Sequence, residues 1–366
     1  MNDRVDIAII GAGMAGASLA AEIGESARVL LIEAESQPGY HATGRSAAFW
    51  SETYGGPAVQ PLTSASGPWL DRHGFLGPRG GLHIADAEGR AALDALAAEF
   101  AGSAVRLDPL DRAALEQRLP GLLPDWTHGL AEPDCRDIDV AAVHAFYLAA
   151  ARRAGAKVRC DAEVLALRPV GGGWRLETRD GPVEAAIVVN AAGAWANRIA
   201  RLAGASPLAI APMRRTIVQI AVDPSAPADL PVVLDAAGRF YFKPEAGGRL
   251  WLSPHDETPV EPCDAAPEEL DVAIAIDRFE HVVDWRVTKR EHAWAGLRSF
   301  ALDRVPVYGF DRQAAGFFWF AGQGGFGIQT APAAAMLGAA LLTGGAMPEP
   351  VRAIDAERYA PERFSA

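Results

Sequence analysis

Apolar runs separated by glycine-rich turns open the chain, and this pattern predicts a βαβ unit. Residues 6–10 form an apolar run typical of a buried strand, and small residues continue at helical spacing to about residue 23. Residues 28–32 are a second apolar, β-branched run, which ends at Glu33. A strand, a helix and another strand in this order predict the start of a parallel sheet with right-handed crossovers.

The rest of the chain mixes helical periodicity with short strand patterns. Helices are expected at residues 90–100, 112–118, 140–154 and 267–283. Strands are expected at residues 163–170, 174–178 and 183–190, joined as an antiparallel run, and at 216–222, 239–243 and 249–253. The length of 366 residues exceeds the roughly 250–300 at which one core usually stops growing. No repeat or linker is visible, so we expect two domains that are interleaved along the chain.

Charge and cysteine content narrow the class of protein. The 34 Lys and Arg residues face 46 Asp and Glu residues, which gives a net charge of −12. Without a basic run of five or more, binding to nucleic acid or to an anionic membrane is not expected. Cys135, Cys160 and Cys263 lie far apart, and the eight histidines show no metal-ligand spacing. We therefore expect no metal site, no disulfide framework and a reducing, cytoplasmic location.

Two uncharged stretches resemble membrane segments only at first sight. Residues 7–21 are too few to cross a bilayer, and the flanking charges are wrong for a signal peptide. Residues 313–348 are long enough, but glycines crowd their middle and would interrupt a lipid-exposed helix. A buried strand, a glycine turn and a buried helix are expected there, and no membrane span.

The first chemical signal is Gly11-x-Gly13-x-x-Gly16, between an apolar strand and a helix. Gly11 permits the tight turn, Gly13 lets a pyrophosphate approach the backbone, and Gly16 allows close packing of helix on strand. The helix N-terminus stabilises the phosphate charge. Glu33 closes the next strand, and its carboxylate can accept hydrogen bonds from ribose hydroxyls. The motif predicts a dinucleotide but does not decide between NAD and FAD.

Three further blocks resemble the D-amino-acid oxidase superfamily of FAD-dependent oxidoreductases: residues 41–48 (HATGRSAA), 188–195 (VVNAAGAW) and 322–329 (GQGGFGIQ). Within this superfamily the chain is most similar to the bacterial D-arginine dehydrogenase branch, at residues 39–48, 214–215, 240–244 and 294–300. The resemblance implies a mixed α/β fold in which a Rossmann-like FAD-binding domain is interleaved with an antiparallel-sheet substrate domain. The FAD domain is expected at residues 1–55, 135–207 and 292–366, and the substrate domain at 56–134 and 208–291.

The resemblance also implies which residues hold FAD. Backbone N–H groups of Arg45–Ala48 would cradle the diphosphate and the ring edge, Glu33 would bind the adenosine ribose, and the Val164 backbone would lie at the adenine. The N–H groups of Gly324–Gln329 would point at the flavin C2 carbonyl. With no cysteine after Cys263, we expect noncovalent FAD. The expected FAD-binding residues are Gly11, Gly13, Ala15, Gly16, Glu33, Ala34, Ala42, Thr43, Gly44, Arg45, Ser46, Ala47, Ala48, Val164, Gly193, Trp195, Gly324, Gly325, Phe326, Gly327, Ile328 and Gln329.

A flavin enzyme that oxidises amino acids needs a cation for the substrate carboxylate, for which a planar guanidinium is best suited. Arg215 and Arg298 match positions with this role in the dehydrogenase branch; a surface salt bridge is the alternative for each. Because Arg214 and Arg215 are neighbours on a strand, only one of them can face the pocket. The expected catalytic residues are Tyr54, Arg215, Tyr241, Arg298 and Gln329.

Two departures from the dehydrogenase branch bear on the substrate. Gly81 stands where that branch has a glutamate that pairs with an arginine substrate, and Phe49 stands where it has a histidine. If Gly81 faces the substrate side chain, a guanidinium there would be buried without a partner. We therefore expect neutral or apolar side chains. His83 is expected to be a lone surface histidine.

The expected function is oxidative deamination of D-amino acids by an FAD-dependent dehydrogenase or oxidase, with hydride transfer from Cα to flavin N5 and hydrolysis of the imino acid to a 2-keto acid and ammonia. Alternatives are a glycine or sarcosine oxidase, an L-2-hydroxy-acid dehydrogenase, or a non-catalytic flavin-binding subunit. The expected partners are a small amino-acid substrate and an electron acceptor, which the sequence leaves open between a quinone, another carrier and oxygen.

Overall fold

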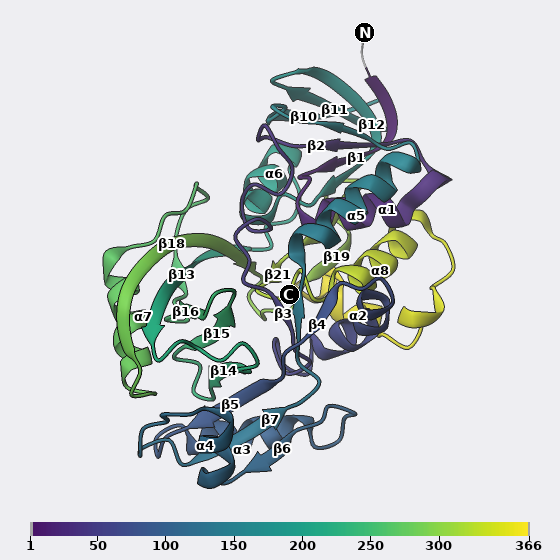
Figure 1. Cartoon of the computed structure of the whole chain (residues 1–366). Coiled ribbons are helices and arrows are strands. Elements are labelled where there is room, and N and C mark those ends of the chain that lie inside the picture. The colour runs from purple at the N-terminus through teal and green to yellow at the C-terminus, as the bar shows by residue number, and fades with distance from the viewer. Residues whose placement is uncertain (1–2, 365–366) are drawn as a thin grey trace.

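The computed structural model describes residues 3–364, which form two large sheets and one small sheet with helices packed around them (Figure 1). The first sheet has the strand order β10-β11-β12-β1-β2-β9, with β20 beside β12 and β19 beside β20. Its strands are β1 (Asp3–Ile10), β2 (Val29–Ile32), β9 (Lys157–Arg159), β10 (Val164–Val170), β11 (Gly173–Thr178), β12 (Gly181–Asn190), β19 (Val307–Phe310) and β20 (Phe317–Ala321).

Strand β1 lies at the centre of this sheet and pairs in parallel with β2 and β12. Helix α1 (Met14–Ile23) connects β1 to β2, so the predicted βαβ unit is confirmed. Alternate side chains of β1 serve two cores: Ile7 and Ile9 pack toward the helical layer, whereas Ala8 and Ile10 pack on the opposite face. Strands β10, β11 and β12 run antiparallel, as predicted.

The second large sheet has the order β21-β18-β13-β16-β15-β14-β5-β7-β6, with the short β17 beside β13. Its strands are β5 (Gly81–Ala85), β6 (Asp108–Leu110), β7 (His128–Glu132), β13 (Ala211–Asp223), β14 (Val232–Asp235), β15 (Tyr241–Glu245), β16 (Arg249–Ser253), β17 (Thr258–Pro259), β18 (Arg286–Phe300) and β21 (Gln323–Gly324). Its strand pairs are antiparallel except for β14 with β5. The longest pair is formed by β13 and β18. The mixed α/β fold with a parallel core and an antiparallel sheet is thus as expected.

A small sheet of β3 (Phe49–Trp50), β8 (Arg136–Ile138) and β4 (Leu76–Pro78) lies between the two large sheets in Figure 1. The remaining helices are α2 (Gln60–Arg72), α3 (Arg90–Phe100), α4 (Arg112–Arg118), α5 (Val140–Arg153), α6 (Ala196–Ala203), α7 (Glu269–Glu280) and α8 (Ala331–Thr343). Short 3₁₀ helices are η1 (Gly24–Ser26), η2 (Gly193–Trp195), η3 (Glu349–Val351), η4 (Ala356–Tyr359) and η5 (Pro361–Phe364). Helix α1 packs against α5 and α8, and α7 covers β13, β16 and β18.

Helices α3 and α4 have the predicted bounds, α5 ends one residue early, and α7 is shorter than the predicted 267–283. Helix α2 was not predicted, because Pro61, Gly67 and Pro68 disrupt its helical pattern. Strand β13 is longer than predicted, since β18 pairs with it from Ala211 to Asp223. Within residues 3–364, the structure contains no helix with the length and apolar character needed to cross a membrane.

Candidate active site

A cavity of about 460 Å³ extends from the carboxyl ends of β1 and β2 to the end of β18. In a parallel sheet this edge is the usual place for a bound nucleotide. Many of the residues expected to bind FAD line it: Gly11, Gly13, Ala15, Glu33, Ala34, Ala42, Thr43, Arg45, Ser46, Val164, Gly193, Trp195, Gly324, Gly325, Gly327 and Ile328. Ala47, Ala48 and Gln329 line a smaller cavity next to it, whereas Gly16, Gly44 and Phe326 line neither.

The glycine turn is packed so tightly that side chains are excluded. Gly11 has φ +103°, and a Cβ atom there would lie 2.4 Å from the Ala191 carbonyl oxygen. Gly13 faces the cavity and is the N-cap residue of helix α1. As a glycine it has no side chain that could cap the helix. Thr43 Oγ1 accepts a hydrogen bond of 2.9 Å from the Met14 N–H. Apart from the Met14 N–H, the helix start therefore offers its first N–H groups and its positive dipole end to an anionic group such as a diphosphate.

Glu33 is held rigidly at the end of β2. Its Oε2 accepts a hydrogen bond of 2.9 Å from Ala12 N–H, and Oε1 accepts one of 3.1 Å from Glu35 N–H. His144, which sequence reasoning did not select, fixes the same turn because its Nε2 donates to the Ala12 carbonyl oxygen over 2.9 Å. Burial lowers the pKa of His144, so this imidazole is neutral. The Glu33 carboxylate keeps free lone pairs on the cavity wall, where it can accept hydrogen bonds from the ribose of a dinucleotide.

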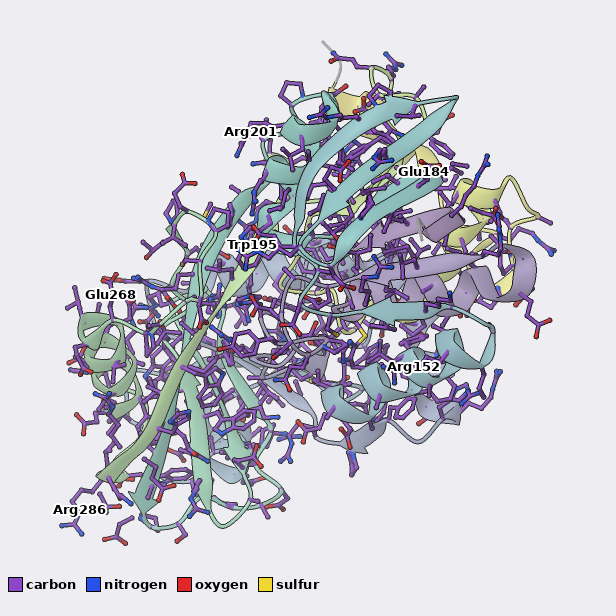
Figure 2. The ribbon with its side chains drawn as sticks, turned by 90° about the horizontal axis from the view of Figure 1, so that it is seen from above. Arg152, Glu184, Trp195, Arg201, Glu268 and Arg286 are labelled. Carbon is purple, nitrogen blue, oxygen red and sulfur yellow. The ribbon has the colours of Figure 1, made fainter. Side chains whose placement is uncertain are left out.

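Residues 41–46 cross from the first sheet to the second. The Arg45 guanidinium is held by protein groups: it pairs with Asp264 and donates to the Ala265 and Ala295 carbonyl oxygens at 2.8 and 3.1 Å. The indole N–H of Trp294 donates to the Arg45 carbonyl oxygen over 3.0 Å and fixes the backbone here. Figure 2 labels Trp195 where the first sheet meets the long strand β18. The centroids of the Trp195 and His41 rings lie 4.6 Å apart. The cavity thus bridges both sheets.

A second cavity of about 50 Å³ adjoins the first, and Arg298 lines both. Aromatic and polar side chains line it, including Phe49, Tyr54, Tyr241 and His255. Gly325 separates Tyr54 from Arg298 so closely that a Cβ atom there would lie 2.1 Å from Tyr54 Oη. The two arginines and two tyrosines selected from the sequence therefore meet at this junction of the cavities.

Arg215 and Arg298 are buried here with unused hydrogen-bond donors. Arg215 Nε donates to the Asp256 carbonyl oxygen over 2.7 Å, and its Nη2 pairs with Glu257 at 3.1 Å. Burial and the nearby Arg298 charge lower the pKa of Arg215 to about 10. Nη1 of Arg215 and Nη1 of Arg298 have no partner among the described residues. Because unpaired buried donors are costly, this pair calls for an anionic ligand such as a carboxylate.

Arg214 points the other way, as the strand alternation predicted. It pairs with Glu268 and, at 2.9 Å, with Asp271 of helix α7. Of the two neighbouring arginines only Arg215 therefore reaches the cavity. Arg298 is charged. Burial by itself lowers the pKa of Arg298, but the interactions with Tyr54 and Tyr241 outweigh burial and raise this pKa above its ordinary value.

Gln329 and Glu132 hold the loop that carries Tyr54. The Gln329 side-chain amide donates to the Ser51 and Tyr54 carbonyl oxygens, each over 3.1 Å, and accepts from Ser51 N–H over 3.2 Å. Its polar atoms are thereby bonded to protein groups, so the side chain holds the loop that carries Tyr54. Gln329 also lines the smaller cavity, and its catalytic role stays a prediction.

Glu132 is buried on the other side of this loop. Its carboxylate accepts hydrogen bonds from Ser51 Oγ (3.0 Å), Thr53 Oγ1 (2.8 Å) and His83 Nε2 (3.0 Å). Burial by itself raises the pKa of Glu132, but these hydrogen bonds outweigh it and lower the pKa. The sequence offered no signal for this cluster, because its members lie up to 81 residues apart.

Two expectations about this region are wrong. Gly81 does not face either cavity: it pairs with Glu132 across β5 and β7, and a Cβ atom there would lie 3.2 Å from Glu132 Cβ and 3.3 Å from Cys135 Cβ. His83 is not a surface residue but 5% exposed and bonded to Glu132. An alternating strand shows which side chains share a face, not what lies opposite that face.

The geometry agrees with comparisons to known proteins. The profile of the family described as FAD dependent oxidoreductase (DAO) matches residues 6–341. Mitochondrial dimethylglycine dehydrogenase of Mus musculus is 34% identical over 127 residues, which cover 34% of this chain and 14% of that protein. Glycine oxidase of Geobacillus kaustophilus is 31% identical over 206 residues, which cover 56% of this chain and 52% of that protein. Its crystal structure shares the fold over the full length of both chains, with a TM-score of 0.84 and 24% identity.

Proposed function

The chain belongs to the DAO family of FAD dependent oxidoreductases, and we propose that it catalyses the oxidative deamination of D-amino acids with neutral or apolar side chains. The observation that carries this proposal is the pair of buried guanidinium groups, Arg215 and Arg298, whose Nη1 atoms have no partner among residues 3–364. They lie where the cavity that fits FAD meets the smaller, aromatic cavity. A carboxylate would satisfy both donors.

FAD is the noncovalent cofactor that this cavity would hold. The start of α1 and the Thr43 hydroxyl group would receive the diphosphate, and Glu33 would bind the ribose. Backbone groups of residues 45–48 and 324–329 would surround the flavin. The chemistry that bound FAD supplies is acceptance of a hydride from the substrate Cα. We further propose the FAD domain at residues 1–55, 135–207 and 292–366, and the substrate domain at 56–134 and 208–291.

The chain's own residues would bind and orient the substrate. Arg298 would hold the carboxylate, with Tyr241 and Tyr54 donating further hydrogen bonds, and Arg215 would contribute its free Nη1. Holding the carboxylate at a fixed point orients Cα toward the larger cavity. After loss of the hydride and of one amine proton to solvent, water hydrolyses the imino acid to a 2-keto acid and ammonia.

The size of the second cavity favours short side chains. About 50 Å³ of space beyond Arg298 suits a side chain of a few atoms. Oxidation of glycine itself is therefore the second candidate, and the partial likeness to a glycine oxidase supports it. Long cationic side chains are disfavoured because two guanidinium charges already lie at the entrance.

Anaerobic mixing of the FAD-loaded protein with candidate substrates tests the proposal. We expect small neutral D-amino acids to bleach the absorbance of the oxidised flavin at about 450 nm. L-enantiomers and 2-hydroxy acids should leave it unchanged. Bleaching by glycine or sarcosine but not by D-alanine would select the second candidate, and bleaching only by L-2-hydroxy acids would overturn both.

A further inference from the structure

His255 lines the smaller cavity in an unusual backbone conformation. It follows β16 and has φ +55°, in the left-handed region that residues other than glycine seldom adopt. Its ring meets Tyr241 edge-on with 5.9 Å between ring centroids. The Arg278 guanidinium ties this segment down by donating to the carbonyl oxygens of Pro254 and Arg239. A strained residue held this firmly at a cavity wall points to a functional constraint.

The hydrogen bonds of His255 determine which ring nitrogen carries the proton. Nδ1 lies 2.6 Å from the Gly238 carbonyl oxygen, and a carbonyl oxygen can only accept. Nδ1 therefore donates, and in the neutral ring Nε2 is left with a lone pair. Across residues 3–364 the structure contains no hydrogen bond to this Nε2.

The surroundings keep this imidazole neutral. Burial is the main cause and the charge of Arg215 the next, and together they lower the pKa of His255 to about 3. Arg298 and Arg304 act in the same direction. Such a ring is a poor general base near neutral pH, so its role is to accept a hydrogen bond and not to remove a proton.

Two unused hydrogen-bond donors lie where the two cavities meet. Arg215 Nη1 and Arg298 Nη1 both need acceptors, which the substrate carboxylate would supply. His255 Nε2 offers the opposite, an acceptor, to which an apolar side chain cannot donate. A hydroxyl or amide group on a short side chain would satisfy it within about 50 Å³.

We propose that His255 is a specificity-determining residue whose Nε2 accepts a hydrogen bond from a hydroxyl or amide on a short substrate side chain. The substrate class is thereby narrowed to small polar D-amino acids such as D-serine, in preference to D-alanine. This inference rests on the proposed oxidation of D-amino acids. It deepens that proposal by assigning the side-chain subsite to His255.

The test compares D-serine with D-alanine in the FAD-loaded protein and two variants. His255→Asn keeps a donor in place of Nδ1–H, tolerates a left-handed backbone, and lacks an atom at Nε2. His255→Gln places an amide oxygen near the Nε2 position. We expect the ratio of kcat/KM for D-serine over D-alanine to fall about tenfold in His255→Asn and to stay within about threefold of wild type in His255→Gln. A change of less than about threefold in His255→Asn would overturn the inference.

His281→Asn is the matched control, because the exposed His281 also bonds through Nδ1 to a backbone carbonyl, that of Asp277, at 2.7 Å. Its substrate ratio should equal that of the wild type. Nitrogen NMR of ¹⁵N-histidine-labelled wild type gives an independent readout, and should show His255 with protonated Nδ1 and bare Nε2 at pH 7. A protonated Nε2 would overturn the inference even if His255→Asn failed to fold.

Failure of the proposed function would be visible separately. If neither amino acid reduces the flavin, that function is wrong. The role of His255 is then tested by binding: the change in the flavin spectrum on adding D-serine or D-alanine gives their dissociation constants. Selective weakening of D-serine binding in His255→Asn would support it, and equal weakening of both ligands would overturn it.

Discussion

Gly16 lies so close to Gly11 that a Cβ atom on Gly16 would come within 1.9 Å of the Gly11 carbonyl oxygen. The same atom would lie 3.2 Å from Ile9 Cγ2, at the end of strand β1. The main chains of Gly11 and Gly16 cannot move apart unless helix α1 moves away from the first sheet. The third glycine of the motif therefore acts through packing and not through contact with the cavity, which it does not line.

Gly16→Ala should consequently lose FAD and stability together. The added methyl group would push the start of α1 off β1 and misplace the helix N-terminus that faces the cavity, with an overpacking cost of about 1–3 kcal/mol. FAD content and melting temperature of the purified protein measure this. Gly102→Ala is the control, since a Cβ atom there meets nothing within 4 Å among the described residues. Full FAD occupancy in Gly16→Ala would contradict the packing argument.

Arg298→Met should raise KM strongly and leave FAD bound. Loss of a charge-assisted carboxylate pair in a buried site costs about 2–5 kcal/mol by analogy with buried interface pairs. Steady-state kinetics with the best D-amino acid give the change in kcat/KM. Arg290→Met, on the same strand β18, should behave as wild type because Arg290 forms only a surface pair with Glu269. A decrease of less than about fivefold in Arg298→Met would show that it does not bind substrate.

Glu132→Gln should weaken both the fold and the substrate site. Ser51, Thr53 and His83 all bond Oε2, whereas the Glu52 N–H bonds Oε1. An amide cannot accept at its nitrogen, so whichever way the Gln amide is placed, the donors on one of these two positions lose their acceptor. Hydrogen bonds to a charged group are worth about 1.5–3 kcal/mol each. Urea unfolding should show a loss of this size, and KM should rise more than kcat falls because the loop carrying Tyr54 shifts. Unchanged kinetics in a destabilised variant would mean that the cluster supports only the fold.

Acidification should destabilise the protein through His255. Its pKa is lowered from 6.5 to about 3 in the folded state by burial and then by Arg215, with Arg298 and Arg304 adding to the effect and the Gly238 hydrogen bond opposing it. Below about pH 6.5 His255 therefore binds a proton in the unfolded chain but not in the folded protein. Stability falls as pH drops from 6.5 toward 3, by up to about 1.4 kcal/mol per pH unit from this group.

Urea unfolding at pH 7.0 and pH 5.0 measures this effect. His255→Asn removes the group, so its stability should fall less than that of the wild type between the two pH values. The buried His144, whose pKa is also lowered, is present in both proteins and cancels in the comparison. Equal losses in the two proteins would contradict a neutral His255 in the folded protein.

Local sequence signals were sufficient to predict most helices and strands and the nucleotide-binding edge of the first sheet. Helices α3 and α4 have their predicted bounds because helical periodicity and capping residues such as Asp111 are local signals. The glycine motif predicted the turn between β1 and α1, since only glycine fits such a close approach of backbones. Strand alternation also separated Arg215, which faces the cavity, from Arg214, which faces α7.

The surroundings of each residue depend on contacts that no local pattern encodes. Gly81 and His83 were misinterpreted because the contacts that decide their roles come from β7, about 50 residues away. Gln329 is bonded to Ser51 across 278 positions, and His255 to Gly238 through a left-handed turn that carries no periodic signal. Periodicity reports whether a side chain is buried, whereas its partner is set by long-range packing of segments that the chain brings together only on folding.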